Sequence, residues 1–471
     1  MKISIENFKS IRKLQNFEIK PLTILSGVNS SGKSSFVQLL LILKQTIELD
    51  SSKKPFFLHG EYTNVKNFKD IIYNKKLERK LKVSFEFSKS EFHQLESLKT
   101  VVIFKTFSDY TCLVEIEYDI NQETETYISA FSVRFNFVED KDIFIVFKSN
   151  MDTNTFSIDT NSAIFENALL FKKLFISNIH YSSLYPDKYE SETVESTEIG
   201  DHKANVEEFS KETINLEDIK MIINSFLKNI SYLKPIREEP KDEYIISNSN
   251  INVGVKGEFV AQILEEKAKE QTTFYIINEQ ENSITYEKIT KTLIESVKYW
   301  MCTVFEVAID IKTEKINDIY KIIFVNKSEL ETTVKHVGFG ISQLLPIVVE
   351  GLRMPKNGTF IIEQPEVHLH PKLQSKLFDF LYGLTLQGKK VIVETHSSHF
   401  ITRMRRRIAE DVNNKIDDQI NLTFIENNTF KSIELDDYGT LNYYPKDFIE
   451  PSNTELRAIV KAQTKKRRKN G

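Results

Sequence analysis

The chain begins with two runs of residues whose apolar pattern predicts strands. KISIENF (2–8) alternates apolar with polar residues, whereas PLTILSG (21–27) is a nearly continuous apolar run that ends at a glycine. The segment SSFVQLLLILKQTI (34–47) then places its apolar residues at the spacing of a buried helix. The N-terminal part is therefore predicted to have the order strand, glycine-containing loop, helix.

A different pattern follows from residue 77 to about residue 150. β-Branched and aromatic residues alternate with polar ones in KLKVSFEFS, TVVIFKTF, CLVEIEYDI, SAFSVRFNFV and DIFIVFKS. Such alternation is typical of an antiparallel sheet with one face in contact with water. We expect an antiparallel meander here.

The middle of the chain is less regular. The stretch 186–213 is acidic, poor in large apolar residues and without a period, which predicts an exposed insertion. The segments NLEDIKMIINSFLKNI (215–230) and YEKITKTLIESVKYWMCTVFEVA (286–308) have helical spacing, and Trp300 falls on the apolar stripe of the second. We expect Trp300 to be a core residue.

After Gly338 the predicted elements alternate between helix and strand. A helix precedes GTFIIEQ (358–364), which reads as a strand, and PKLQSKLFDFLYGLTLQ (371–387) reads as the next helix. The strand KKVIVETH, another helix and the short strands NLTFIEN and FKSIELD complete the series. This order is typical of a parallel sheet wrapped by helices.

Composition and charge limit the classes of function. The chain has 471 residues and a net charge of −4, so no strong overall attraction to nucleic acid or to an anionic membrane is expected. It has only two cysteines, it shows no signal-peptide core and it holds no apolar run long enough to span a bilayer, all of which predicts a cytoplasmic protein without a membrane partner.

The most specific motif is GVNSSGKSS (27–35), which matches the phosphate-binding loop G-x-x-x-x-G-K-[ST] in its required context between strand and helix. Gly27 and Gly32 allow a tight turn whose N–H groups point at a β-phosphate. Lys33 can bridge the β- and γ-phosphate oxygens of ATP, and the Ser34 hydroxyl can bind Mg²⁺. The nucleotide-contacting residues predicted in this loop are Asn29, Ser30, Ser31, Gly32, Lys33, Ser34 and Ser35.

A second glycine-containing segment, VGFGISQLLP (337–346), directly precedes a predicted helix. Two glycines and a serine at a helix N-terminus form an arrangement that can bind an anion. The candidate nucleotide-binding residues in this segment are Gly338, Gly340, Ser342 and Gln343.

Together these motifs resemble those of ABC-type ATPases of the SMC and RecF branch. VGFGISQLLP resembles the signature motif, TFIIEQPEVHLHP (359–371) the Walker B segment, and VIVETHSSHF (391–400) the segment with the switch histidine, which would be His396. In ISIENFKSI (3–11), Lys9 matches a basic residue that approaches the nucleotide in that branch. The resemblance implies ATP and Mg²⁺ as cofactors, with Ser34 and Glu363 as the residues that hold the metal.

The fold implied by this resemblance is an α/β ATPase head with a mainly parallel sheet, an antiparallel β lobe, a helical insertion and no long coiled coil. We expect an N-terminal part of the head at 1–76, the β lobe at 77–150, a helical and insertion region at 151–330 that contains the acidic loop 186–213, and the C-terminal part of the head at 331–471.

One position departs from the ABC pattern. Gln364 stands where the catalytic glutamate is expected, directly after Glu363. A glutamine can orient water, but it cannot accept a proton, so the resemblance predicts slow hydrolysis. Glu366 could supply the missing carboxylate instead. His368 and His370 fall where the dimer-contact loop of this branch lies, and metal binding by this pair is the weaker interpretation.

Other segments suggest a narrower relationship. ISYLKPIREEP (230–240), NVGVKGEFVAQIL (252–264) and the ending GTLNYYPKDFIE (439–450) resemble stand-alone bacterial ATPases related to OLD proteins and to the ATPases of two-component anti-phage systems such as Septu and PARIS. This resemblance implies a role in anti-phage defence with a separately encoded effector, a nuclease or toxin. No long coiled-coil arm and no nuclease are expected in this chain.

The resemblance also implies a homodimer or higher homo-oligomer in which two protomers enclose ATP. Two alternatives remain: a scaffold that binds ATP and scarcely hydrolyses it, and a RecF-like repair ATPase that binds DNA. The basic clusters RMRRRIAED (403–411) and KKRRK (465–469) are the features that favour nucleic acid, although a solvated helix face and a frayed tail are equally good interpretations.

Overall fold

The computed structural model describes residues 1–28, 31–49, 56–93, 109–122, 125–138, 142–150, 155–161, 176–182, 185–191, 216–245, 252–280, 283–412, 416–443 and 445. The chain forms two compact units. The first contains Met1–Ile19 and Ser34–Ile230, and the second contains Lys20–Lys33 and Ser231–Gly471. Residues Lys20–Lys33, which include the strand before the phosphate loop, thus belong to the second unit, although the chain on either side of them belongs to the first.

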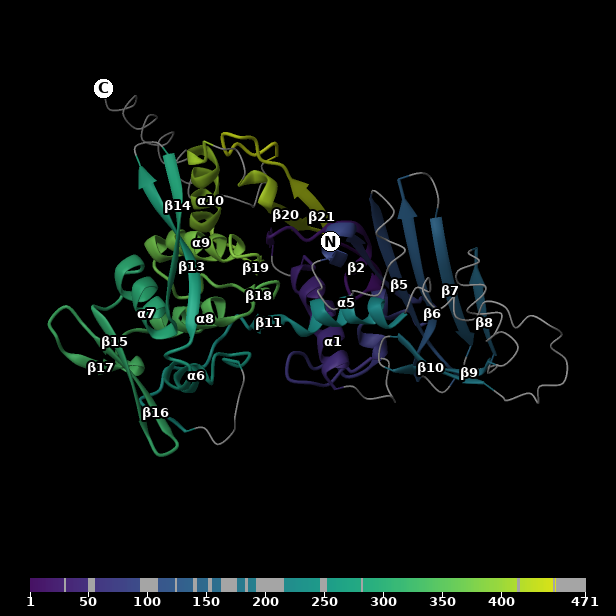
Figure 1. The fold of residues 1–471 in the computed structure, drawn as a ribbon, viewed down its shortest axis with the longest axis horizontal. Helices are drawn as coiled ribbons and strands as arrows, with labels where there is room; N and C mark the ends of the chain where they lie inside the picture. The colour runs from purple at the N-terminus through teal and green to yellow at the C-terminus, as the bar shows by residue number, and fades with distance from the viewer. Residues whose placement is uncertain are drawn as a thin grey trace, which may run out of the picture. The chain divides into compact units, whose positions relative to one another are not determined.

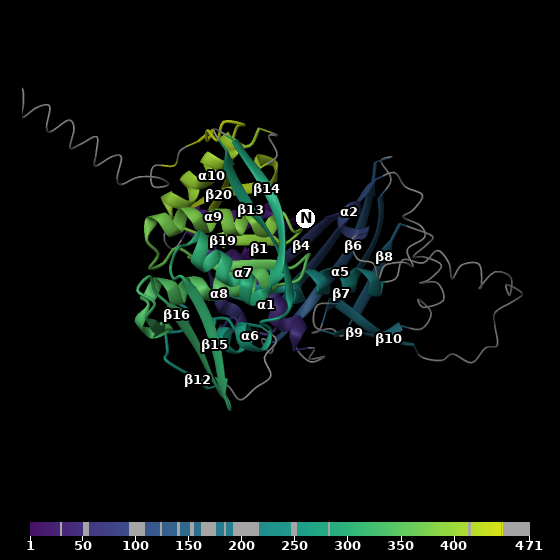
Figure 2. The ribbon, with the colours of Figure 1, turned by 60° about the vertical axis from the view of Figure 1, so that its left-hand side comes forward.

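The first unit is built on a seven-stranded sheet whose order is β2-β1-β4-β5-β6-β7-β8. Its strands β6, β7 and β8 are labelled in Figure 2. All of its neighbouring strands are antiparallel. The strands are β1 Lys2–Phe8, β2 Ile11–Glu18, β4 Leu81–Ser88, β5 Tyr110–Ile120, β6 Thr126–Phe137, β7 Asp142–Asn150 and β8 Thr155–Thr160. The meander expected from the alternating pattern is confirmed, and β1 and β2 extend it. The segment TVVIFKTF lies outside the described residues.

Alternation of side chains explains why this sheet has one buried face. In β5 every second residue is buried, from Tyr110 through Cys112, Val114 and Ile116 to Tyr118. The other elements of the unit are α2 Lys89–His93, β9 Ile176–Ser182, β10 Tyr185–Ser191, α5 Leu216–Lys228 and, from Ser34 on, α1 Lys33–Glu48. Most of the predicted acidic insertion lies outside the described residues, although its first residues belong to β10.

The second unit contains a six-stranded sheet of order β11-β18-β19-β3-β20-β21. β18, β19, β3 and β20 run parallel, and β21 closes one edge as an antiparallel hairpin strand. The strands are β3 Leu22–Gly27, β11 Ile230–Leu233, β18 Thr359–Glu363, β19 Lys390–Glu394, β20 Ile420–Glu426 and β21 Thr429–Ile433. The parallel sheet predicted from the alternating order is confirmed.

Three helices accompany this sheet: α8 Phe339–Arg353, α9 Pro371–Thr385 and α10 Ser398–Glu410 (Figure 1). The central strands are apolar at nearly every position, as strands covered on both faces must be. Phe360, Ile362, Val391 and Val393 are 0% exposed and belong to one hydrophobic core with residues of α8, α9 and α10.

The segment 286–308 differs from its expected single helix. Its first part belongs to a long hairpin of β13 Gln271–Gln280 and β14 Ser283–Thr292, and only then do α7 Leu293–Lys298 and a π-helical turn Tyr299–Val304 begin. Thr292 explains the change, because its side chain accepts from the backbone of Glu295 while Glu295 bonds back to Thr292 in a capping box. The apolar residues of β14 before Thr292 happen to match the helical spacing of the residues that follow.

The expectation that Trp300 is a core residue is confirmed. Trp300 is 2% exposed, and its ring lies 4.9 Å from that of Phe380 in an edge-to-face arrangement. The unit also holds α6 Val260–Glu266 and a small antiparallel sheet of β12 Tyr244–Ile245, β15 Asp310–Ile316, β16 Ile319–Val325 and β17 Glu331–Thr333. The hairpins of residues 271–292 and 310–325 add strands to a region for which helices were expected.

No long coiled coil occurs in the described part of the chain, where α1 with 16 residues is the longest helix. In that same part, no helix has both the length and the apolar character needed to cross a membrane.

Candidate active site

The predicted motifs of the second unit meet at the carboxyl edge of the parallel sheet. In the strand register, Glu363 at the end of β18 pairs with Glu394 at the end of β19, and Glu394 pairs with Leu25 of β3. β3 runs two residues further, to Gly27. Since neighbouring strands are ~4.8 Å apart, the Walker B strand and the phosphate-loop strand lie ~10 Å apart with β19 between them. The crevice beyond such an edge is where ligands bind in open parallel sheets.

Gly27 starts the phosphate loop at a point of close backbone approach. A Cβ atom there would lie 2.1 Å from the carbonyl oxygen of Ile425, and the φ of Gly27 is +143°. Both constraints allow only glycine. The loop is thereby held tightly against β20.

Lys33 is buried at 3% exposure and is held by carbonyl oxygens of its own loop. Its ammonium group donates to Gly27 O at 3.0 Å and to Val28 O at 2.8 Å. Burial lowers the pKa of Lys33, and the charge of Glu394 opposes that effect only in part. The cation has no carboxylate in hydrogen-bond contact in these bonds, so its positive field is available to a phosphate.

The other residues of the phosphate loop differ in their surroundings. Ser31 is 4% exposed, and its hydroxyl is shielded and has no hydrogen-bond partner among the described residues. Gly32 has φ +107°. Ser34 is exposed in the first turn of α1. Asn29 and Ser30 lie outside the described residues.

Ser35 and Lys9 lie with Ser34 in the first unit. The Ser35 hydroxyl is 2.9 Å from that of Ser10. Lys9 has φ +47°, and its ammonium group donates to Gln38 of α1. The role of Lys9 at the nucleotide remains a prediction.

Glu363, the expected metal ligand, is oriented by a tyrosine. The hydroxyl of Tyr232, a residue of β11, donates to Glu363 Oε1 at 2.6 Å. Burial raises the pKa of Glu363, although the hydrogen bond from Tyr232 and the charges of Lys234 and Arg237 act in the opposite direction. A partly buried carboxylate that a hydroxyl donor holds in place is suited to receive a cation.

Gln364 adopts a left-handed backbone conformation, with φ +45°. Its N–H donates to Glu394 O at 2.7 Å, which continues the pairing of β18 with β19 by one residue. A left-handed conformation costs a non-glycine residue ~1–3 kcal/mol and must be held by its surroundings. The peptide that carries Gln364 is therefore fixed in an unfavourable but defined orientation.

Glu366 ties the loop after β18 to the loop after β19. Its Oε1 accepts the backbone N–H of His396 at 2.6 Å. Burial raises the pKa of Glu366 by more than this hydrogen bond lowers it. Burial and the nearby charge of Lys33 lower the pKa of His396. The structure thus brings Lys33, Glu366 and His396 to the same edge.

The segment predicted to be a signature motif begins α8. Gly338 precedes the helix with φ +98°, and a Cβ at Gly340 would lie 2.4 Å from the carbonyl oxygen of His368. Ser342 is 7% exposed and its hydroxyl donates to Phe339 O at 2.7 Å. Gln343 is 1% exposed and accepts from the backbone N–H of Arg237 at 3.2 Å. Within one chain, Gln343 is thus a packing residue of α8.

Sequence reasoning assigned no role to Tyr232 or Arg237, both of which contact the end of β18. Arg237 is 1% exposed and donates to the carbonyl oxygens of Glu363 and Gln364. Their segment, ISYLKPIREEP, was noted for its family resemblance alone. The available signal was the apolar strand β11 followed directly by charged residues, which predicts side chains at a sheet edge.

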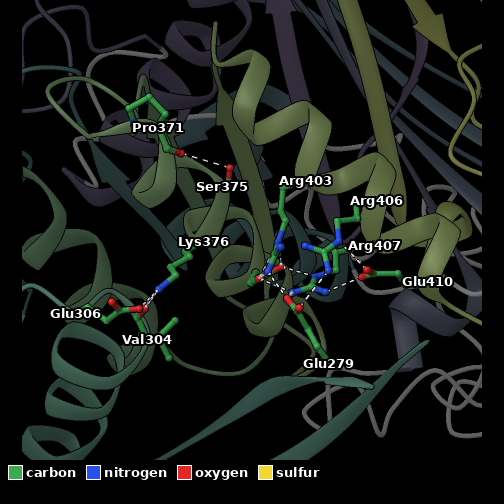
Figure 3. Close-up of polar contacts among 11 residues, drawn as sticks. Glu279, Val304, Glu306, Pro371, Ser375, Lys376, Arg403, Arg406, Arg407 and Glu410 are labelled. Carbon is green, nitrogen blue, oxygen red and sulfur yellow. Dashed lines mark hydrogen bonds and ion pairs between the residues drawn. The ribbon is translucent and has the colours of Figure 1, made fainter. Parts of the chain in front are cut away.

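Three arginines of the basic cluster at 403–411, Arg403, Arg406 and Arg407, are neutralised by ion pairs within the chain. Arg403 and Arg407 of α10 form ion pairs with Asp379 of α9 and with Glu279 of β13, and Arg406 and Arg407 pair with Glu410 (Figure 3). These guanidinium groups hold the β13-β14 hairpin to α9 and α10. The cluster therefore gives no support to a nucleic-acid surface, and the KKRRK cluster lies outside the described residues.

His368 and His370 are exposed and do not face each other as a pair of metal ligands would. The His368 ring lies 4.7 Å from that of Phe339, edge to face, and His370 caps α9 by accepting from Lys372 N. Nowhere in the described residues do three His, Cys, Asp or Glu side chains gather as a metal site would require.

The residues at the sheet edge fit a nucleotide with its magnesium ion. Among the described residues the shielded Ser31 hydroxyl lacks a partner, the Lys33 ammonium group donates to two backbone carbonyl oxygens, and Glu363 presents a partly buried carboxylate. These are a donor, a cation and an anionic metal ligand, which together suit phosphate oxygens and Mg²⁺.

Comparison with known proteins gives a family. A family model described as "AAA ATPase domain" matches residues 1–401. No curated protein matches the chain. Among solved structures, an SMC head domain from Thermotoga maritima is similar at 9% identity and TM-score 0.34, covering 92% of this chain and 98% of that one. An SMC head bound to the C-terminal winged-helix domain of ScpA is similar at 10% identity and TM-score 0.35, with 92% and 96% covered.

Proposed function

Because this chain belongs to the AAA ATPase domain family, we propose that it binds ATP at the carboxyl edge of its parallel sheet and hydrolyses it slowly. The observation that carries the proposal is the register of β3, β19 and β18, which aligns the phosphate loop, Glu394 and Glu363 along one edge.

Binding is expected to use the loop from Gly27 to Ser34. The ammonium group of Lys33 leaves the carbonyl oxygens of Gly27 and Val28 and moves to the phosphates, which carry more negative charge. Backbone N–H groups of the loop and the first turn of α1 add further donors. We expect Ser34 and Glu363 to hold Mg²⁺, as the motif resemblance implies, and the ion would neutralise charge on the phosphates when bound.

Hydrolysis requires that a water molecule be oriented for attack. Gln364 can donate to and accept from this water, but its amide cannot take up the proton. Glu366 is the nearest alternative carboxylate in the sequence, and one of its oxygens is engaged by His396 N. We therefore expect turnover that is slow compared with an ATPase that has a glutamate at position 364.

The test is a comparison of wild type with Lys33→Ala in nucleotide binding and phosphate release. We expect Lys33→Ala to lose magnesium-dependent ATP binding, whereas Lys372→Ala, at a surface lysine that is 60% exposed, should bind normally. Equal ATP binding by wild type and Lys33→Ala would refute the proposal.

The oligomer that we propose encloses ATP between two copies, with Gly340 and Ser342 of one copy facing the phosphate loop of the other. Support comes from α8, whose first residue Phe339 is 39% exposed and packs on the exposed His368 ring, so apolar surface remains uncovered there. Light scattering with ATP and with Lys33→Ala tests this. A mass that ATP does not change would contradict it.

A role in anti-phage defence is the most specific part of the proposal. The motif resemblance supports it, and slow turnover at Gln364 suits a protein that holds a separately encoded nuclease or toxin in check. Copurification from the native host, with and without ATP, should recover that effector. Recovery of DNA with ATP-dependent and salt-dependent affinity would favour the RecF-like repair role instead.

A further inference from the structure

Arg237 occupies an unusual position behind the end of β18. Its guanidinium group is 1% exposed, and it donates from Nη2 to Glu363 O at 3.1 Å and from Nη1 to Gln364 O at 3.4 Å. Its Nε is shielded and has no hydrogen-bond partner among the described residues. A buried arginine that donates to backbone carbonyl oxygens, with no carboxylate in contact among the described residues, is costly.

The two carbonyl oxygens belong to the residues that matter most at the sheet edge. The Glu363 side chain carries the expected metal ligand, and Gln364 is expected to orient the attacking water. Gln364 has φ +45°, so its peptide needs external support on both sides. Glu394 O supports its N–H at 2.7 Å, and Arg237 supports its carbonyl oxygen.

The segment that carries Arg237 is itself fixed. The backbone N–H of Arg237 donates to Gln343 Oε1 of α8 at 3.2 Å, and Tyr232, five residues earlier, donates to Glu363 Oε1 at 2.6 Å. β11 therefore bonds to the Glu363 carboxylate through Tyr232, and the segment after β11 bonds to α8 and to the backbone at the end of β18 through Arg237.

We propose that Arg237 is a positioning residue for ATP hydrolysis: its guanidinium group, planar and anchored on the carbonyl oxygens of Glu363 and Gln364, sets the direction of both side chains. This inference rests on the proposed ATPase function. Arg237 acts through Gln364 and does not itself contact the nucleotide. Lysine cannot replace it, because an ammonium group lacks the planar fork that reaches two adjacent carbonyl oxygens.

The experiment compares Arg237→Lys with Arg407→Lys, a matched change at another arginine that is 1% exposed. Two ligands are used: ATPγS, which reports ground-state binding, and ADP with aluminium fluoride, which reports the arrangement needed for attack. We expect Arg237→Lys to bind ATPγS within about threefold of wild type and to trap ADP with aluminium fluoride ~10- to 100-fold less well. Arg407→Lys should change neither, and melting curves establish that each variant is folded.

A double substitution gives an independent readout. If Arg237 acts through Gln364, Arg237→Lys should lower trapping much less in a Gln364→Ala background than in wild type. Equal loss in both backgrounds, an equal loss of ATPγS and trapped-nucleotide binding, or no loss at all would overturn the inference. Failure of wild type to bind either nucleotide better than Lys33→Ala would instead refute the proposed ATPase function.

Discussion

Arg237 and Arg407 are equally buried, at 1% exposure, but the second unit holds them in opposite ways. Arg407 contacts three carboxylates, from Asp379, Glu279 and Glu410, at 2.6–2.8 Å. Arg237 donates to two backbone carbonyl oxygens. Burial lowers the pKa of both, but around Arg407 the hydrogen bonds and charges of its acidic partners outweigh burial and raise it, whereas the pKa of Arg237 falls to about 10.

The difference separates structural cations from functional ones. A cation saturated by carboxylates adds no net charge to its surroundings and serves to join elements, here the β13-β14 hairpin with α9 and α10. Lys33 resembles Arg237, since it is held by carbonyl oxygens and burial lowers its pKa. Cations held in this way keep their positive field, which phosphate groups and metal-binding carboxylates can use.

The largest effect should come from placing a carboxylate at position 364, next to the carbonyl oxygens that Arg237 contacts. We expect Gln364→Glu to raise the rate of ATP hydrolysis ~10²–10⁴-fold, because a carboxylate can accept the proton of the attacking water. ATP affinity should stay nearly unchanged. Steady-state phosphate release and nucleotide titration measure the two quantities.

The rate increase expected from Gln364→Glu depends on whether Glu366 already accepts the proton of the attacking water. If Glu366 already accepts the proton, the gain from Gln364→Glu is small and Glu366→Gln loses activity. No change from either substitution would mean that neither residue contacts the attacking water.

Removing Arg407, the arginine held by carboxylates, should lower the free energy of unfolding and leave the rate of ATP hydrolysis unchanged. Arg407→Met leaves Asp379, which is 7% exposed, with Arg403 as its remaining ion-pair partner. Breaking a buried ion pair typically costs about 3–5 kcal/mol of the free energy of unfolding, and we expect the lower end of that range. Urea unfolding measures it.

Arg406→Met is the control for that change, because Arg406 is 49% exposed in the same cluster. It should cost less than about 1 kcal/mol. Equal losses from the two substitutions would show that burial does not distinguish these ion pairs.

A smaller effect is expected from Tyr232→Phe, which removes the one hydroxyl that donates to Glu363 Oε1 at 2.6 Å. A hydrogen bond to a charged group contributes about 1.5–3 kcal/mol, so the magnesium concentration needed for half-maximal ATP binding should rise ~10-fold. Tyr438→Phe, at a residue that is 82% exposed, should leave it unchanged. An unaltered magnesium dependence in Tyr232→Phe would show that the hydroxyl does not orient the carboxylate.

The last prediction concerns Lys389, whose ammonium group donates to Gly351 O at 2.8 Å and Leu352 O at 3.1 Å. Burial lowers its pKa from 10.5 to about 7. Above pH 7 the unfolded chain binds a proton that the folded chain has lost, so raising the pH stabilises the fold. Relative to Lys389→Met, the free energy of unfolding of wild type should increase by up to ~1.4 kcal/mol per pH unit between pH 7 and 9.5. A flat difference across that range would show that Lys389 stays protonated.

The sequence was a good guide wherever one element determined its own structure. The strand, loop and helix around Lys33 and the alternating elements after Gly338 were predictable, because a glycine loop and apolar periods act locally. The start of α7 at Thr292 was not predicted, because the apolar spacing stays helical on both sides of Thr292 although the capping box begins a new helix there. The local sequence pattern does not show whether the capping box or the helical spacing determines the structure.

The candidate site was predictable only in part, for a different reason. Lys33, Glu363 and His396 carry motif signals, but Tyr232 and Arg237 reach the site from β11, which is 126 to 131 residues away along the chain from their partners. Such contacts depend on which strand occupies the edge beside β18. The sequence also could not show that the arginines at 403–407 are neutralised, because Asp379 and Glu279 come from other elements.

The contact between Gly340 and His368 has a mechanical consequence. A Cβ at Gly340 would lie 2.4 Å from His368 O, so the start of α8 and the loop after β18 touch through backbone atoms with no side chain to yield between them. That loop contains Glu366, whose Oε1 accepts a hydrogen bond from His396 N at 2.6 Å. If two copies enclose ATP as proposed, a displacement of the start of α8 by the neighbouring copy would reach His396 through this backbone contact and the Glu366 hydrogen bond.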